Sequence, residues 1–264
     1  MLGLHINGWY NGAFPRGGRV TTCVDLDLGQ LRWVRQQVGM NHLLVVRYWV
    51  DPEQEAILRD PVEGARQWMD RYIDRMRVAH VNVAPVVFQS LNEVPRQFSE
   101  AYAVFERERI RWMHQHRMGS AIGAFSVGQP EEEDIRRWWL PTIRAMTNWD
   151  VWTTHEYYSD REDLDDPGCW HAGRCLRMMD AVPELCDKWH AITECGRDWI
   201  PDLNRGKPGW KLTVNRETFL EELHLYASRL AASKRNILGA CVYSVGRLAQ
   251  GHEGFRADEL VGGL

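Results

Sequence analysis

Short runs of mostly apolar residues recur along the whole chain. They lack a strict alternation of apolar and polar positions, which is typical of parallel strands that are covered on both faces. The runs lie at 2–6, 20–26, 42–49, 83–91, 120–127, 150–157, 189–195 and 239–245. This recurrence predicts an α/β protein with a parallel sheet.

Amphipathic segments separate many of these runs. Asp27 is a suitable N-cap for a helix over 28–38, whose apolar residues share one stripe. Further helices are predicted over 62–76, 99–116, 131–140 and 215–235. Strands that alternate with helices indicate βαβ units.

Eight strand candidates in about 250 residues favour a closed (β/α)8 TIM barrel over an open sheet. The first two candidates are separated only by "NGWYNGAFPRGGR", which is short for a helical crossover. We therefore expect an abbreviated first βα unit, unless the second strand is misplaced. Because repeats, low-complexity segments and linkers are not evident, the prediction is one barrel that forms a single catalytic domain over 1–264.

The composition is that of an ordinary soluble protein, and the charge balance reduces the number of partner classes to consider. Hydrophobic residues make up 44% and charged residues 26% of the chain. The net charge of −4 gives no electrostatic reason to expect nucleic acid or an anionic membrane as a partner. The start, "MLGLHING", lacks the basic and apolar regions of a signal peptide. Two cellular locations remain open. The protein could be cytoplasmic, or it could be secreted as part of a longer chain.

Thirteen tryptophans are an unusually large number for this length. Most are expected in the core, but an indole also stacks well on flat ligands. Five follow strands or lie in loops and are candidates for a ligand surface, namely Trp9, Trp49, Trp170, Trp199 and Trp210.

The six cysteines do not form a CxxC pair, which argues against a zinc ribbon and a thioredoxin-type site. Cys169 and Cys175 flank a polar loop, where they could be bridged or free. Cys23, Cys195 and Cys241 lie in apolar runs and are expected to be buried thiols.

Polar residues gather where the apolar runs end. In a TIM barrel the active site lies at the carboxyl ends of the strands, so these side chains are expected to meet at one mouth. They are His5, Asn7, Arg47, Asn92, Glu93, Ser126, His155, Tyr157, Glu194, Tyr243 and Ser244. Two carboxylates with a guanidinium and several neutral donors are what glycoside hydrolysis by a carboxylate pair requires.

The two glutamates are expected to differ in protonation. A charge near a core is costly unless it is paired or used. One carboxyl must carry a proton for the leaving oxygen, so its pKa has to rise, while the other must stay ionised. Arg47 and Tyr157 would keep Glu194 ionised. Glu93, without an obvious adjacent cation, would be the acid.

Four short motifs resemble those of clan A glycoside hydrolases. "SLNEV" at 90–94 and "ITECG" at 192–196 resemble the signatures at the ends of strands four and seven. "HEY" at 155–157 resembles the His-x-Tyr of strand six in cellulase-like members. "VGMNHLLVVRYW" at 38–49 resembles the early segment whose arginine supports the nucleophile.

The resemblance implies a retaining O-glycosidase that acts on a β-linked glycan without a cofactor or metal. Glu93 would be the acid/base and Glu194 the nucleophile. Tyr157 would orient Glu194. Tyr243 stands where many clan members carry a stacking tryptophan. The substrate-binding residues would be His5, Trp9, Arg47, Asn92, His155, Tyr157, Trp199 and Tyr243.

Two other functions remain open. A non-catalytic carbohydrate-binding barrel could hold a glycan through its tryptophans, since a fold does not fix a function. A metal-dependent barrel enzyme would need several carboxylate and imidazole ligands at one site. GxSxG, GxGxxG and Walker motifs do not occur, which argues against serine hydrolase, dinucleotide and P-loop chemistry. The sugar, its linkage and the oligomeric state are not predicted.

Overall fold

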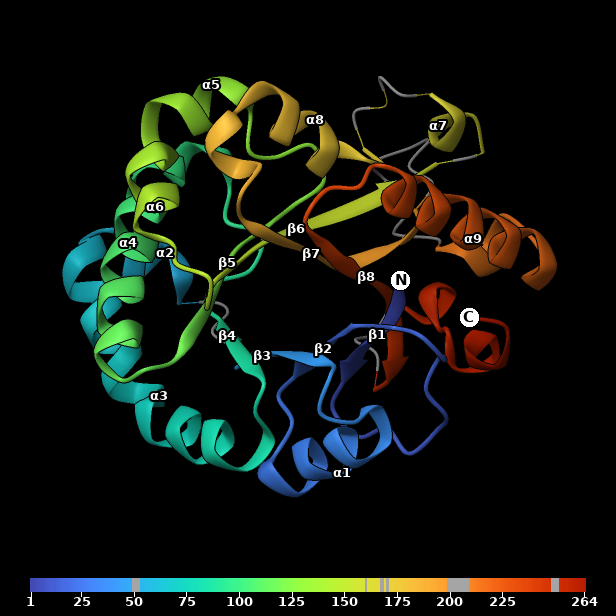
Figure 1. Cartoon of the computed structure of the whole chain (residues 1–264), viewed down its shortest axis with the longest axis horizontal. Helices are drawn as coiled ribbons and strands as arrows, with labels where there is room; N and C mark the ends of the chain where they lie inside the picture. The colour runs from blue at the N-terminus through green and yellow to red at the C-terminus, as the bar shows by residue number, and fades with distance from the viewer. Residues whose placement is uncertain (49–52, 160, 167–168, 170, 199–208, 248–251) are drawn as a thin grey trace.

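The chain folds into a closed barrel of parallel strands, which pair in chain order from β1 to β8 and back to β1 (Figure 1). The computed structural model describes residues 1–48, 53–159, 161–166, 169, 171–198, 209–247 and 252–264. The strands are β1 (Leu2–Asn7), β2 (Val20–Val24), β3 (Leu43–Arg47), β4 (Val86–Gln89), β5 (Gly119–Phe125), β6 (Val151–Tyr158), β7 (Trp189–Arg197) and β8 (Ile237–Gly246). The predicted (β/α)8 TIM barrel is confirmed.

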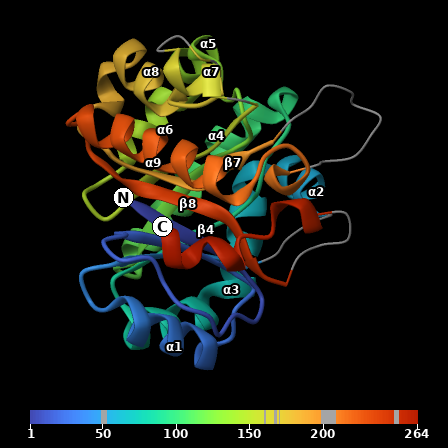
Figure 2. The ribbon, with the colours of Figure 1, turned by 90° about the vertical axis from the view of Figure 1, so that its right-hand side faces the viewer.

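Helices surround the barrel (Figures 1 and 2). The α-helices are α1 (Leu28–Val38), α2 (Gln54–Leu58), α3 (Pro61–Val83), α4 (Ser99–Gln115), α5 (Glu132–Asp134), α6 (Leu140–Ala145), α7 (Arg161–Asp165), α8 (Arg174–Ala181) and α9 (Arg216–Ala232). Residues 8–19, all of which the structure describes, contain no α-helix, so the first βα unit is abbreviated as expected. Both termini lie on the same side of the barrel (Figures 1 and 2).

Two helices begin at the capping residues that the sequence provides. The Asp27 side chain accepts a hydrogen bond from the backbone of Gln30, and the Gln30 side chain accepts one from the backbone of Asp27. Asn215 accepts from the backbone N–H of Thr218 at the start of α9. Both caps satisfy N–H groups that have no partner inside a helix.

Side-chain alternation divides the apolar residues into two layers. The inner cluster fills the barrel near the amino ends of its strands and consists of Val20, Val45, Val87, Ala121, Val151, Ala191 and Cys241. A larger outer layer lies between barrel and helices, where Trp68, Trp139 and Trp152 are buried. The inner cluster makes the barrel a packed core rather than a pore.

The described cysteines are free thiols, so Cys169 and Cys175 are not bridged. Cys23, Cys195 and Cys241 are buried, as predicted. Among the helices that the structure describes, none combines the length and apolar character that a bilayer crossing requires.

Arg35 of α1 is a buried cation that joins two segments of backbone through four carbonyl groups. Its Nε donates to the carbonyl of Val83 at 3.0 Å. Its Nη atoms donate to the carbonyls of Gly39, His42 and Pro85 at 2.5, 2.6 and 2.7 Å. The guanidinium thus satisfies carbonyls between α1 and β3 and between α3 and β4, which lie far from one another in sequence.

Replacing Arg35 by Leu should lower the free energy of unfolding by about 3 kcal/mol, because buried carbonyls lose their donors. Urea unfolding followed by circular dichroism measures this. Arg32→Leu on the same helix is the matched control, since Arg32 makes an exposed contact to Asn82. The control should change the value by less than about 1 kcal/mol. Equal losses in both variants would contradict the structural role of Arg35.

Candidate active site

Alternation along the strands turns several of the predicted residues into the barrel mouth. On β6, Val151 belongs to the inner cluster, so His155 and Tyr157 share its side while Glu156 faces the helices. Glu156 accepts hydrogen bonds there from the backbone of α8 and from Tyr226. On β3, Arg47 follows Val45 on the inner side in the same way.

A register shift brings Glu194 to the inner side of β7. Thr154 of β6 pairs with Ile192, but the next residue, His155, pairs with Glu194, so Thr193 is an extra residue in β7. Strict alternation from the inward Ala191 would have turned Thr193 inward and Glu194 outward. The irregularity reverses this and places the carboxylate in the mouth.

Glu93 is held in a left-handed backbone conformation just beyond β4. Its φ is 47°, which is uncommon for a residue with a side chain and costs on the order of 1 kcal/mol. Its backbone N–H donates to the carbonyl of Ala124 in β5 at 3.0 Å. Backbone strain that surrounding contacts hold in place, as this hydrogen bond does, is often found at functional sites.

The structure brings Glu93 and Glu194 together around His155. Nδ1 of His155 lies 2.9 Å from Oε1 of Glu93, and Nε2 lies 3.6 Å from Oε1 of Glu194. One carboxylate oxygen of each glutamate and one ring nitrogen all lie within 4.8 Å of one another. The Glu93 side chain is 34% exposed and that of Glu194 only 8%. Two carboxyl groups of different solvation therefore face the same space.

Glu194 is held as an anion. Burial alone would raise its pKa, but the charges of His155, His5 and Arg47 and a hydrogen bond from Tyr157 outweigh burial and lower the pKa well below its usual range. Nη1 of Arg47 lies 3.4 Å from Oε1, and the Tyr157 hydroxyl donates to Oε2 at 3.0 Å. Both oxygens of this carboxylate thus have a partner.

The protonation states of the groups around Glu194 are compatible with an ionised carboxylate at this position. Burial lowers the pKa of His5 to about 4, although nearby Glu194 opposes the shift, so His5 is neutral at pH 7. Burial and the charge of Glu194 raise the pKa of Tyr157 well above its usual value, so the phenol remains a donor. The guanidinium of Arg47 is charged at any pH near neutrality and supplies a permanent positive charge beside Glu194.

Asn92 lies beside Arg47, and hydrogen bonds to two neighbouring residues hold it in place. Its side-chain oxygen accepts a hydrogen bond from Nη1 of Arg47. Its backbone N–H donates to Oε1 of Gln54 at 3.4 Å. Gln54 lies on the short helix α2 and was not predicted from the sequence, because it belongs to no recognisable motif.

Tyr243 closes one side of the mouth within an aromatic group. Its ring lies 4.9 Å from that of His5 and 6.3 Å from that of Tyr157, between ring centroids. Phe255 and His252, which follow β8, pack on Tyr243, and the Tyr243 oxygen lies 3.2 Å from Nδ1 of His252. Neither Phe255 nor His252 was predicted from the sequence, because both follow the last strand in a segment without a recognisable pattern.

The tryptophans expected at the ligand surface have different positions. Trp9 is 65% exposed, and its carbonyl lies near Gly246 at the end of β8, but no described contact joins its indole to the carboxylates. Trp210 is buried against Phe219, so its assignment to a ligand surface was wrong. The predictions for Trp49, Trp170 and Trp199 lie outside the described residues.

Within the part of the chain that the structure describes, two groups of side chains have the donor atoms and spacing to hold a metal ion. One is Glu93, His155 and Glu194 itself. The other is Asp163, Cys169 and His171, near α7 and α8. In the second group the Cys169 sulfur already accepts backbone N–H groups of His171 and Ala172 at 3.4 Å.

Solved structures of glycoside hydrolases are similar to this chain at low sequence identity. A GH26 β-mannanase from Bacteroides ovatus is 14% identical, with a TM-score of 0.51 over 98% of this chain and 87% of that chain. A GH128 endo-β-1,3-glucanase from Amycolatopsis mediterranei, solved with laminaripentaose, is 12% identical, with a TM-score of 0.46 over 86% and 80%. No protein-family model and no curated protein matches the sequence. The first similarity supports the TIM-barrel fold.

Burial of neutral His5 predicts a pH-dependent stability. The pKa is lower in the folded protein, about 4, than the usual 6.5, so the unfolded chain binds the proton first as pH falls. His5 therefore contributes stability that is complete above about pH 6.5 and is lost towards pH 4, by up to about 3 kcal/mol. Urea unfolding between pH 4.5 and 7.5 measures the slope of the free energy of unfolding against pH.

His5→Gln should have a smaller slope than the wild type in this window. His190 should preserve part of the slope, because burial also lowers its pKa to about 4. His224→Gln is the control, since His224 is exposed, and its slope should equal that of the wild type. A slope that His5→Gln leaves unchanged would show that His5 does not titrate as described.

Proposed function

We propose that this protein is a retaining glycoside hydrolase that cleaves a β-linked glycan, with Glu194 as the nucleophile and Glu93 as the acid/base. The observation that carries the proposal is the approach of the two carboxylates to within 4.8 Å at the carboxyl ends of the barrel strands. Direct attack by a carboxylate needs a separation of about 5–5.5 Å, whereas inversion through a water needs about 6.5–9.5 Å. The short separation therefore favours retention.

In the first step, an oxygen of Glu194 attacks the anomeric carbon and forms a glycosyl ester. Glu93 gives its proton to the glycosidic oxygen, whose bond to the anomeric carbon breaks. The low pKa of Glu194 keeps it ready for attack, and its hydrogen bond from Tyr157 orients it. The greater exposure of Glu93 suits a group that must reach the departing sugar.

In the second step, Glu93 is a carboxylate and takes a proton from a water molecule. That water attacks the anomeric carbon and releases Glu194, so the configuration is retained after two inversions. His155 contacts Glu93 at 2.9 Å and can hold its carboxyl group in place during both steps. Asn92, fixed by Arg47, is positioned to bind the sugar hydroxyl next to the anomeric carbon.

The other predicted residues supply the walls of the sugar site. His5 and Tyr243 pack on each other at the mouth. Trp9 is exposed after β1 and can offer an indole face to a sugar further along the glycan. The β-mannanase and β-glucanase of similar fold make mannans and β-1,3-glucans sensible members of a substrate panel.

Glu194→Gln should lower kcat at least about 1,000-fold on any glycan that the wild type cleaves, because the amide cannot form the glycosyl ester. A panel of mannans, β-glucans, peptidoglycan and aryl β-glycosides is tested by release of reducing ends or of the aryl group. NMR of the first product anomer tests retention. Glu217→Gln, an exposed site on α9, is the control and should keep wild-type activity.

Undiminished turnover by Glu194→Gln would remove Glu194 from the proposed role. The assays are also run with EDTA, because Glu93, His155 and Glu194 could hold a metal ion. Loss of activity on chelation would favour a metal-dependent enzyme. Glycan binding without any turnover, preserved in Glu194→Gln and in Glu93→Gln, would favour a carbohydrate-binding barrel.

Glu93→Gln should discriminate between substrates by their leaving groups. Cleavage of a natural glycan should fall about 1,000-fold, since its leaving oxygen needs a proton. A dinitrophenyl β-glycoside needs little protonation, so its first step should proceed and release a burst of dinitrophenol before slow turnover. Stopped-flow absorbance measures the burst. Equal losses on both substrates without a burst would contradict the acid role.

A further inference from the structure

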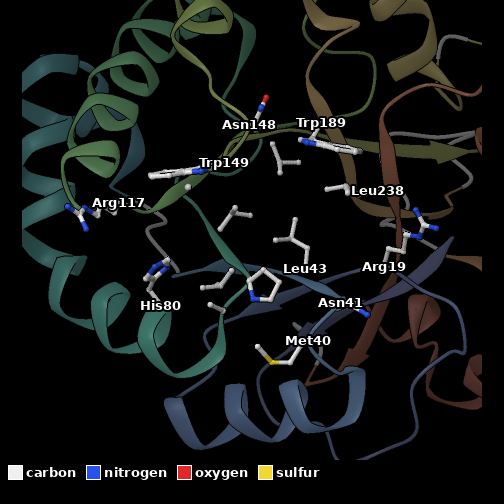
Figure 3. A pocket seen from close by; sticks show the side chains of 16 residues that line it. Arg19, Met40, Asn41, Leu43, His80, Arg117, Asn148, Trp149, Trp189 and Leu238 are labelled. Carbon is white, nitrogen blue, oxygen red and sulfur yellow. The ribbon is translucent and has the colours of Figure 1, made fainter.

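A cavity lies at the opposite end of the barrel from the two glutamates. It has a volume of about 820 Å³, within the usual range for small-molecule sites. Its lining comes from the amino ends of the strands and the segments before them, including Leu43, Val86, Gly119, Val151 and Leu238 (Figure 3). The inner apolar cluster separates this cavity from the candidate active site.

The floor of the cavity is aliphatic. Val87 and Val151 belong to the inner cluster, and Leu43 and Leu238 pack against that cluster. Pro85 continues the same surface. A floor of this kind gains free energy by covering apolar groups, at about 0.8 kcal/mol per buried methylene, and offers little to sugar hydroxyls.

Two exposed indoles form walls of this cavity. Trp149 is 55% and Trp189 41% exposed, although both are large apolar side chains. Figure 3 shows them edge-on, so their ring faces are turned across the opening. Met40, 65% exposed, lies at the opposite edge. Exposed apolar residues that gather at one hollow indicate a binding surface, whereas scattered ones do not.

The charged residues of the lining have one sign. Arg19 and Arg117 lie at opposite edges of the opening (Figure 3). Among the lining residues that the structure describes there is no aspartate or glutamate. A guanidinium at the rim of an apolar cavity attracts a carboxylate and forms charge-assisted hydrogen bonds with it. A sugar site would instead be expected to offer acceptors to the hydroxyl groups.

We propose that this cavity at the amino ends of the strands binds a small amphipathic anion, an aliphatic or aromatic carboxylate. The tail would lie on the aliphatic floor between the indoles, and the carboxylate would bind Arg19 or Arg117 at the rim. This inference does not rest on the proposed glycosidase activity, because the inner cluster lies between the two sites.

Isothermal titration calorimetry with decanoate, kept below its micelle-forming concentration, tests the proposal. We expect one site per chain with a Kd on the order of 10–100 μM. Decyltrimethylammonium, which has the same tail and the opposite charge, should bind at least about tenfold more weakly. Lack of saturable binding, or equal affinity for the two amphiphiles, would overturn the proposal.

Variants locate the site. Arg19→Gln combined with Arg117→Gln should weaken decanoate binding about tenfold and abolish the preference for the anion. Trp149→Ala combined with Trp189→Ala should weaken both amphiphiles. Arg59→Gln is the control, since Arg59 is exposed and does not line the cavity. Circular dichroism confirms that each variant is folded.

Sedimentation velocity without ligand tests the rival occupant, a second copy of the chain. A monomer that stays monomeric up to high concentration is expected. A dimer that the two tryptophan substitutions dissociate would overturn the proposal and assign the surface to self-association. Unchanged decanoate binding in both double variants would likewise overturn it.

Discussion

The site depends on one electrostatic constraint, the stabilisation of the nearly buried carboxylate of Glu194. An ionised carboxylate out of water is costly unless its charge and its lone pairs are compensated. Arg47 of β3 supplies the charge, and Tyr157 of β6 supplies a hydrogen bond. The compensation therefore exists only when the barrel is closed, because β3 lies across its mouth from β7 while β6 pairs directly with β7.

Much of this arrangement was predictable from sequence because parallel strands direct their carboxyl ends to the same rim. Arg47, Glu93, His155, Tyr157 and Glu194 each stand at or just after the end of an apolar run, and the structure brings all five together. Strand ends can be read without coordinates, since a change from apolar to polar residues marks them. Their roles in catalysis stay predictions.

Other features depend on geometry that leaves no local pattern. The extra residue Thr193 decides which side chain of β7 faces inward, and a simple alternation rule would have selected the wrong one. The contacts of Gln54 and His252 with the site depend on where the short helix α2 and the segment after β8 pack relative to the barrel. Trp210 was misassigned because a loop tryptophan and a core tryptophan look alike in sequence.

The proposed mechanism keeps the charge of the site constant. Before attack Glu194 is the anion and Glu93 carries the proton, whereas in the glycosyl ester Glu194 is neutral and Glu93 is the anion. His155 contacts both carboxyl groups, at 2.9 and 3.6 Å, so it faces one negative charge at each stage. In this mechanism the negative charge moves only between carboxylate oxygens that lie within 4.8 Å of each other, next to the Arg47 guanidinium. A preorganised environment of this kind needs little rearrangement during the reaction, which is the main source of electrostatic catalysis.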